Sequence, residues 1–334
     1  MKNNEFTPQN ILVSRTDKIG DIILTLPLIS EIKRIYPDSK VTFLIRKIMK
    51  DLLQGYEGID DFMFIDDFTS ESDMQEKISE RNFDTAFAVY PRFQLALAFY
   101  KAGIRYRIGS AYRWYSFLFN IKIKEHRKFA IKHEYQYNLG LLRAISDKVV
   151  DNVVFHFRYS DKEKQQLRIK LLDKGITPDS DFIIIHPGSR ASAKDLPLEI
   201  LIKAVNEFID NTPGINIFLT GQADESEIIN RIIDSIPKSK RSRIFSLAGM
   251  LTLRELMILI DSCKVFVSNS TGPIHIAGAL NKNIVGFYPE TPPMGPVRWE
   301  PLSDNSIILT PNDSYDSMES IKPERIAEAI KELL

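Results

Sequence analysis

The chain has 334 residues, of which 44% are hydrophobic, and its 44 Lys and Arg balance its 44 Asp and Glu. The length predicts two globular domains, and the zero net charge argues against a wholly basic nucleic-acid-binding protein but not against a local charged face. The single cysteine, Cys263, excludes a disulfide scaffold and a cysteine-based zinc site and fits a reducing compartment. The polar N-terminus and the short apolar runs predict a cytoplasmic protein without signal peptide or membrane helix.

Short β-rich runs alternate with helical stretches through the first half of the chain. Pro27 falls inside the first predicted helix, and it either kinks that helix or marks its true start. The charged stretch 151–180 interrupts the alternation and holds one helical segment, so we expect a domain boundary after residue 175. The predicted strands are 11–14, 41–45, 62–65 and 85–89, and the predicted helices are 22–36, 48–53, 72–80, 93–101 and 162–174.

The second half repeats this alternation. It predicts parallel sheets covered by helices on both faces, in an α/β protein of two doubly wound domains, 1–175 and 176–334. The last amphipathic helix is free to pack back on the first domain. Two such domains form a cleft, and open α/β sheets bind ligands at the carboxyl ends of their strands. The predicted strands are 182–186, 215–220, 244–246, 265–267 and 284–287, and the predicted helices are 197–210, 224–236, 253–261, 273–280 and 323–334.

The loop after the first strand, 15–21, ends in Gly20 and Asp21 at the head of a helix. Asp21 is either a helix N-cap or a general base facing the cleft, and its spacing alone does not separate these two readings. Asp17 is a weaker rival for the role of base.

Two loops of the second half carry groups that suit a bound anion. The loop 186–190 combines a Gly-Ser turn with Arg190 and is followed by Lys194, which suits a diphosphate or is simply an exposed polar loop. The loop 268–275 opens a helix, whose start favours negative charge. The alternative there is plain capping by Thr271, with His275 as a hydrogen-bonded core histidine.

Two further segments carry charged groups. Glu225, shortly after Gly221, can accept hydrogen bonds from ribose hydroxyls or is an ordinary acid in the first turn of a helix. The stretch 101–132 carries nine Lys and Arg against one acid, with aromatic residues between them. Such an excess is either a solvated face or a surface for an anionic partner, either nucleic acid or phosphorylated glycolipid at an anionic membrane.

Taken together, these loops resemble the heptosyltransferase family of bacterial lipopolysaccharide synthesis, glycosyltransferase family nine. The segment 11–27, a strand followed by Gly-Asp and then Leu-Thr-Leu-Pro, is similar to the N-terminal signature of that family. The C-terminal signature of the family is similar to three segments of the chain, 247–249, 253–256 and 268–277. The family also matches the segments 102–104, 107–109 and 133–134. The ordered set covers nearly the whole chain.

The resemblance implies a GT-B architecture of two Rossmann-like domains facing a central cleft, with acceptor bound by the first and nucleotide sugar by the second. It implies inverting transfer of a heptose from an ADP-activated donor to a lipopolysaccharide inner-core acceptor, without a metal or any cofactor beyond the nucleotide sugar. Asp21 matches the catalytic base, Lys194 the phosphate-binding lysine, and Glu225 the ribose-binding position. The remaining donor-binding positions are Ser189, Met250, Leu251, Ser270, Thr271, Gly272 and His275, and the acceptor-binding positions are Arg105, Arg107 and Arg113.

The chain departs from the family at a few positions. Ser270 stands where the family usually has Asp, which removes a charge beside the donor, so a different donor sugar or a non-catalytic nucleotide-sugar-binding protein are the alternatives. Leu196 replaces a common Trp, and Tyr288 a frequent Gly. A nucleic-acid binder built on 101–132 is the weakest alternative, because no nucleic-acid motif accompanies it. The expected partners are a nucleotide sugar, a phosphorylated glycolipid and, peripherally, the inner face of the cytoplasmic membrane, with no nucleic acid.

Overall fold

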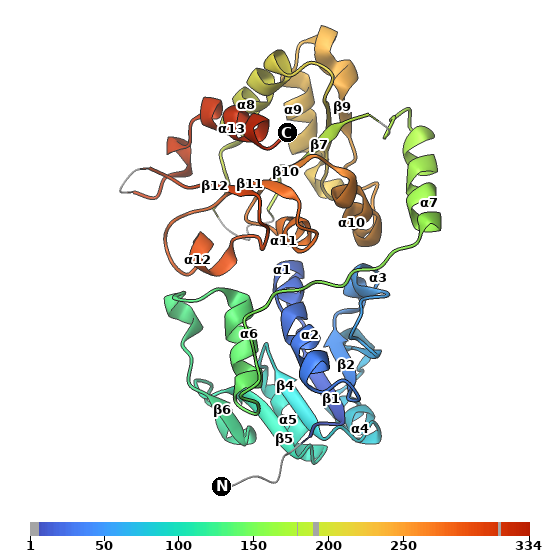
Figure 1. Cartoon of the computed structure of the whole chain (residues 1–334), viewed down its shortest axis with the longest axis vertical. Coiled ribbons are helices and arrows are strands. Elements are labelled where there is room, and N and C mark those ends of the chain that lie inside the picture. Colours follow the sequence, from blue (N-terminus) through green and yellow to red (C-terminus); the bar gives the residue numbers. More distant parts are fainter. Residues whose placement is uncertain (1–6, 179, 190–193, 313–314) are drawn as a thin grey trace. The chain divides into compact units, whose positions relative to one another are not determined.

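The computed structural model describes residues 7–178, 180–189, 194–312 and 315–334, so Arg190 lies outside the described residues. The chain divides into two compact units, Met1–Arg158 and Tyr159–Leu334 (Figure 1). Each unit contains one six-stranded sheet, and all of its neighbouring strands run parallel.

The first unit has the sheet order β3-β2-β1-β4-β5-β6. Its central strands are almost completely buried because helices cover both faces of a parallel sheet. Its elements are β1 (Asn10–Ser14), α1 (Ile19–Ile23), α2 (Leu26–Ile35), β2 (Lys40–Ile45), α3 (Lys50–Leu53), β3 (Asp61–Phe64), α4 (Glu71–Glu80), β4 (Thr85–Ala88), α5 (Phe93–Lys101), β5 (Tyr106–Ser110), β6 (Ile121–Ile123) and α6 (Glu134–Arg143).

The second unit has the sheet order β12-β11-β10-β7-β8-β9, which is the order of the first unit when strands are counted from β7. The predicted α/β class with two doubly wound sheets is therefore confirmed. Its elements are α7 (Asp161–Leu172), β7 (Phe182–His186), α8 (Leu198–Asn211), β8 (Asn216–Leu219), α9 (Ser226–Ser235), β9 (Ile244–Ser246), α10 (Leu253–Ser262), β10 (Val265–Asn269), α11 (Gly272–Ala279), β11 (Asn283–Phe287), α12 (Pro296–Trp299), β12 (Ser306–Leu309) and α13 (Pro323–Glu332).

The first predicted helix is two helices. Pro27 occupies the first turn of α2, where its missing N–H costs nothing, and so it marks a helix start rather than a kink. The break between α1 and α2 is supported from α6, where Asn138 donates its amide to the carbonyl of Leu24 at 2.8 Å. Asp21 thereby lies on a separate short helix directly behind the β1 loop.

Helix α7 belongs to the second unit, although the sequence predicted it as the last helix of the first domain. Lys170 donates to both carboxylate oxygens of Glu255 at 2.9 and 2.8 Å, and Arg254 donates to Glu163 at 2.8 Å. The division accordingly falls after Arg158 and not after residue 175. The highly charged sequence of α7 does not reveal its packing surface, because ion pairs to α10 make much of that contact.

The closing helix α13 packs on α8 and presents Ile326, Ala327 and Ile330 to the hydrophobic core of the second unit. Its apolar face is therefore used within its own unit. Cys263, which ends α10, is buried in the same unit, and burial raises the pKa of its thiol to about 12.

Several elements were not predicted. Strands β6 and β12 are the outermost strands of their sheets and bury few side chains completely, so their apolar pattern is weak. Strand β5 contains a charged and a glycine residue, and α6 is rich in polar and aromatic residues. Their sequences read as parts of the basic stretch or as loop, as does the short helix α12.

Candidate functional site

Both sheets reverse their strand order at their first strand, between β1 and β4 and between β7 and β10. Ligands of open α/β sheets bind beyond the carboxyl ends of the strands at this point. The loops that follow these four strands are therefore the candidate sites, one group in each unit.

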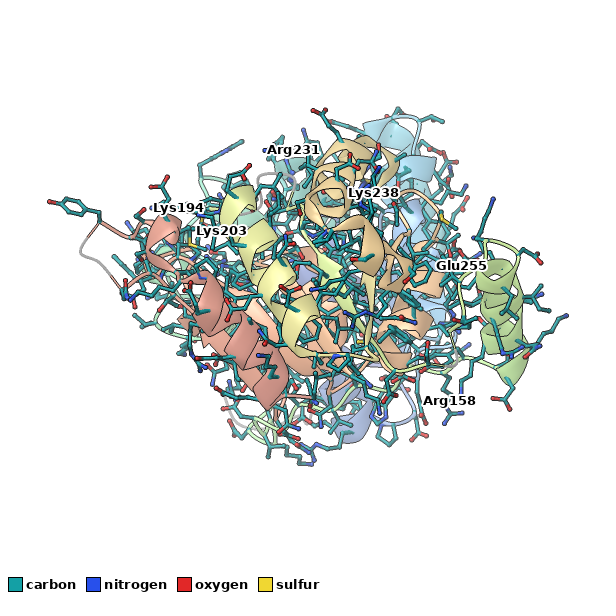
Figure 2. All side chains as sticks on the ribbon, turned by 90° about the horizontal axis from the view of Figure 1, so that it is seen from above. Arg158, Lys194, Lys203, Arg231, Lys238 and Glu255 are labelled. Carbon is teal, nitrogen blue, oxygen red and sulfur yellow. The ribbon has the colours of Figure 1, made fainter. Side chains whose placement is uncertain are left out.

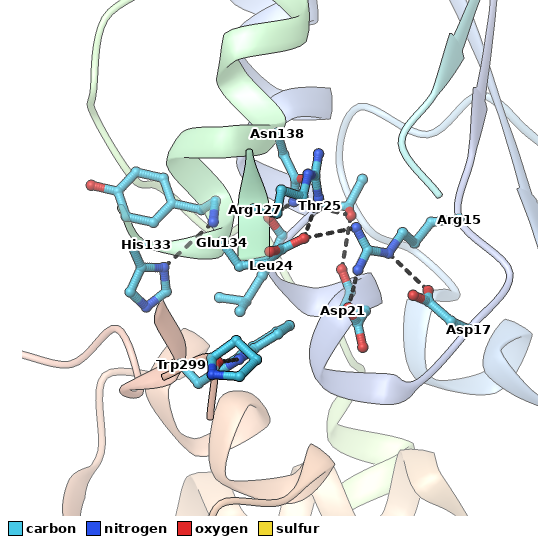
Figure 3. A network of polar contacts seen from close by, with 12 residues as sticks. Arg15, Asp17, Asp21, Leu24, Thr25, Arg127, His133, Glu134, Asn138 and Trp299 are labelled. Atoms are coloured by element: carbon cyan, nitrogen blue, oxygen red, sulfur yellow. Dashed lines mark hydrogen bonds and ion pairs between the residues drawn. The ribbon is translucent and has the colours of Figure 1, made fainter. Parts of the chain in front are cut away.

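Arg15 follows β1 directly and contacts three carboxylates (Figure 3). Its guanidinium donates through Nε to Asp17 at 2.8 Å, through one terminal nitrogen to Glu134 at 3.0 Å, and through the other to Asp21. Arg127 also contacts Glu134, whose side chain is completely buried. Two arginines and three carboxylates thus form one network at the switch point of the first sheet.

Asp21 lies in the first turn of α1, and Lys18 occupies the N-cap position. The N-cap alternative for Asp21 is therefore not what the structure shows. Its side chain is 15% exposed, so it is largely enclosed but still reaches the surface. Arg15 fixes its orientation, and the start of α1 adds a favourable field for a negative charge. Asp21 is therefore a carboxylate of fixed orientation at the position where the sequence analysis expected a base.

Asp17 is also held by Arg15. Burial raises the pKa of Asp17, and the adjacent Arg15 offsets only part of this effect. A raised pKa brings a carboxyl closer to the range that suits proton transfer, so Asp17 stays a rival base.

Tyr90 and Arg92, which follow β4, were missed by sequence reasoning. The guanidinium carbon of Arg92 lies 4.7 Å from the centroid of the Tyr90 ring, and that of Arg15 lies 5.8 Å from it. The signal for them was their place after a predicted strand. They add positive charge and an aromatic face to the same switch point.

The three predicted acceptor-binding arginines are not brought together. Arg107 donates to the backbone carbonyls of Leu118 and Ile104, so its guanidinium ties the loop after β5 to the sheet. Arg105 precedes β5 and therefore lies at the amino ends of the strands, while the exposed Arg113 follows its carboxyl end. Only Arg113 lies at the edge where ligands of such sheets bind.

In the second unit, Glu225 lies between two glycine turns. A Cβ placed on Gly188 would fall 1.8 Å from one carboxylate oxygen of Glu225, so any larger residue there would displace the Glu225 side chain. The other oxygen accepts a hydrogen bond from the backbone N–H of Gln222 at 2.7 Å. Glu225 thus caps its own helix, and the same carboxylate abuts the loop after β7.

The loop after β9 packs against this position. Gly249 has φ +66°, and a Cβ on it would lie 2.9 Å from the Cβ of Ala223. This contact places the half-buried Met250 and Leu251 beside the helix start that carries Glu225. The positions expected at the adenine and at the ribose are therefore neighbours.

Asn269, at the end of β10, contacts both ends of the segment between β7 and α8 and was not predicted. Its amide nitrogen donates to the carbonyl of Pro187 at 2.9 Å, and its amide oxygen accepts from the N–H of Leu196 at 2.8 Å. The loop that contains the buried Ser189 is thereby fixed against the strand at the switch point.

The start of α11 is not capped by a side chain. Thr271 occupies the N-cap position, but its hydroxyl contacts that of Ser268 at 3.0 Å instead of a backbone N–H. Capping by the Thr271 side chain is therefore wrong. The first turn of α11, at Gly272, keeps its backbone donors and dipole for an anion.

Ser270 and His275 flank that start. The buried Ser270 donates its backbone N–H to the carbonyl of Phe287 at 3.2 Å, and its hydroxyl hydrogen-bonds the Tyr288 side chain. His275 is buried in α11, with its ring edge-on to Trp299 at a centroid distance of 6.3 Å. The structure thus agrees with a core histidine at this position.

Lys194 is paired with Asp316. Its ammonium lies 3.1 Å from both the carboxylate and the backbone carbonyl of that residue. Burial alone would raise the pKa of Asp316, but hydrogen bonds from Thr291, Glu290 and Lys194 together lower it to about 2. The expected phosphate ligand is therefore a tethered lysine.

Comparisons with known proteins identify the family of the chain. The family described as glycosyltransferase family 9 (heptosyltransferase) matches residues 72–328. The chain belongs to glycosyltransferase family 9. Lipopolysaccharide heptosyltransferase 2 of Escherichia coli K12 is 23% identical over 354 residues, which cover 97% of this chain and 98% of that protein.

Two solved structures share the fold of this chain. The structure of E. coli ADP-heptose lipopolysaccharide heptosyltransferase II has a TM-score of 0.81 at 21% identity and covers 97% of this chain and 98% of its own. A family 9 glycosyltransferase from Veillonella parvula has a TM-score of 0.84 at 18% identity and covers 98% of both chains.

Among the described residues, no group of three or more His, Cys, Asp or Glu is placed to hold a metal ion. In the part of the chain that the structure describes, every helix is too short or too polar to cross a bilayer.

Proposed function

We propose that this family 9 glycosyltransferase transfers a heptose from an ADP-activated donor to a phosphorylated lipopolysaccharide inner-core acceptor, with inversion at the anomeric carbon. The acceptor and donor classes are supported by the names of its relatives, an E. coli lipopolysaccharide heptosyltransferase and an ADP-heptose heptosyltransferase. The observation that carries the proposal is the carboxylate of Asp21, held by Arg15 at the switch point of the first sheet.

In the proposed reaction, Asp21 accepts the proton of an acceptor hydroxyl. The hydroxyl oxygen forms a bond to the anomeric carbon as the bond from that carbon to the diphosphate oxygen breaks, which releases ADP. Proton transfer of this kind contributes about 10²- to 10⁴-fold to a rate. The negative charge that develops on the diphosphate is met by the uncapped start of α11 and by Lys194, without a metal in the proposed step.

The donor site is proposed to use the neighbours described above. Glu225 accepts hydrogen bonds from the ribose, and the backbone at Met250 and Leu251 contacts the adenine. Ser270 brings no charge to the sugar, so the choice of heptose over a related sugar rests on shape and neutral hydrogen bonds. The same proposal places the protein in the cytoplasm, in contact with the inner membrane where its glycolipid acceptor lies.

The test incubates the purified chain with ADP-heptose and a heptose-accepting inner-core oligosaccharide and follows the product by mass spectrometry. We expect transfer with inverted configuration, and a loss of at least a hundredfold in Asp21→Asn with unchanged ADP affinity. A matched Asp17→Asn variant separates the two carboxylates. Near-normal turnover in Asp21→Asn would overturn the assignment of the base. ADP-heptose binding with no product from any acceptor would favour the non-catalytic binding protein, and transfer from another ADP-sugar would correct the donor.

A further inference from the structure

One edge of the first unit exposes large apolar side chains. They lie in residues 111–132, the loops that follow β5 and β6 together with β6 itself, here called the 111–132 segment. Trp114 and Ile131 are each 74% exposed, Phe117 is 65% exposed and Phe129 is 57% exposed. Four large apolar side chains exposed within one short segment make it a candidate contact surface, because soluble domains rarely expose large apolar patches.

Contacts between aromatic rings hold the loops of the 111–132 segment together. The rings of Tyr112 and His126 stack at 3.5 Å between centroids, and Phe129 meets His126 edge-on at 5.5 Å. These contacts join the two loops, because β5 and β6 are parallel neighbours and their carboxyl ends share an edge. Trp114 in turn stacks on Phe93 at the start of α5, at 4.8 Å. The apolar side chains are therefore displayed on a fixed platform.

Cations are interleaved with these apolar side chains along the 111–132 segment. Arg113, Lys122, Lys124 and Lys128 are all exposed, and none of them is in an ion pair with a described residue. The remaining cations of the segment are neutralised: Arg127 contacts Glu134, and Lys132 lies 2.6 Å from Glu125. The surface charge of the segment is thus positive although the chain as a whole is neutral.

We propose that the 111–132 segment docks this protein on an anionic lipid bilayer. The headgroup region, where amphipathic and aromatic side chains are favoured, receives the four exposed apolar side chains Trp114, Phe117, Phe129 and Ile131. The four cations named above bind lipid phosphates. A polynucleotide fits less well, because the aliphatic Ile131 offers no stacking face. The inference rests on the proposed function only for the location of the acceptor, since lipid binding itself requires no transfer.

The test measures flotation of the full chain with phosphatidylcholine vesicles, with and without 30% phosphatidylglycerol. We expect binding to the anionic vesicles that weakens with salt. Each cation near the surface is worth about a fivefold change in affinity, so Lys122→Gln/Lys124→Gln/Lys128→Gln is expected to bind about a hundredfold more weakly. Phe117→Ser/Ile131→Ser is expected to lose the binding that persists at high salt.

Matched controls change residues of the same kind elsewhere. Lys203→Gln/Lys238→Gln removes two exposed lysines of the second unit, labelled in Figure 2, and Ile48→Ser removes an apolar side chain that is 62% exposed. Both controls are expected to bind vesicles like the wild type. All variants are expected to keep their thermal transitions, and Asp21→Asn is expected to float normally, so a failure of the catalytic proposal leaves this test intact.

Three results would overturn the inference. The first is equal, weak flotation of the wild type with neutral and anionic vesicles at low salt. The second is vesicle binding that the segment variants and the controls reduce equally. The third is tight, salt-dependent binding to an oligonucleotide without vesicle binding, which would assign the segment to nucleic acid.

Discussion

Replacement of Arg15 is expected to destabilise the first unit strongly. Arg15→Met keeps the apolar stem but removes the cation that contacts Asp17, Asp21 and Glu134. The Arg15 side chain is only 3% exposed and the Glu134 side chain is completely buried, so the carboxylates lose a partner that water replaces poorly. Breaking a buried ion pair from one side typically costs about 3–5 kcal/mol.

We place this variant at about 3–5 kcal/mol and not higher, because Arg127 still contacts Glu134 and because Asp17 and Asp21 are 15% exposed. The matched control is Arg105→Met, which removes an exposed arginine of the same unit. A surface change of that kind is expected to stay within about 0.5 kcal/mol.

In the assay, each protein is titrated with guanidinium chloride, and its unfolding is monitored by hydrogen exchange and mass spectrometry of peptides. Peptides from β1 and β4 report the first unit, and peptides from β7 and β10 report the second unit as an internal reference. The expected result is a shifted transition in β1 and β4 alone. A loss below about 1 kcal/mol, or one equal to that of Arg105→Met, would refute the reasoning that this network holds the unit together.

Three further predictions concern the second unit. Burial lowers the pKa of His186 to about 4. The free energy of unfolding is therefore expected to be highest above pH 6.5 and to fall as the pH drops from 6.5 to 4, by at most about 1.4 kcal/mol per pH unit. In the same denaturant titration, the free energy of unfolding of His186→Gln is expected to change less with pH. Gly188→Ala is expected to weaken ADP binding at least tenfold in calorimetry, because the new Cβ collides with the Glu225 carboxylate; unchanged affinity would contradict the packing. Asp316→Asn is expected to tighten ADP binding up to about fivefold by releasing the half-exposed Lys194 from its ion pair, whereas Lys194→Gln is expected to weaken ADP binding. Weaker ADP binding by Asp316→Asn would show that the ion pair positions the lysine.

Much of the fold could be predicted from local sequence. The strand 182–186 and the helix 93–101 have the predicted bounds, because each buries apolar side chains that mark it in the sequence. The outer strands β6 and β12 bury too little to leave a pattern. Helix α7 was assigned to the wrong side of the boundary because its partners, Glu255 and Arg254, are distant in the sequence.

The candidate site shows the same limit. The loops that hold Asp21 and Glu225 were found because each follows a strand. The long-range contacts of the site were not predicted: Arg15 meets Glu134 across 119 positions of sequence, and Lys194 meets Asp316 across 122. Such contacts are products of tertiary packing, and no local pattern encodes them.

The buried Cys263 can report the opening of the native chain by its chemical labelling. A thiolate is the species that reacts with alkylating and disulfide reagents, and burial suppresses both its formation and its access. Since Cys263 is the one cysteine of the sequence, each molecule that becomes labelled has undergone an opening event in the second unit. The rate of labelling, measured with and without nucleotide, therefore reports how often the second unit opens and how far a bound donor suppresses this opening. No engineered probe is needed.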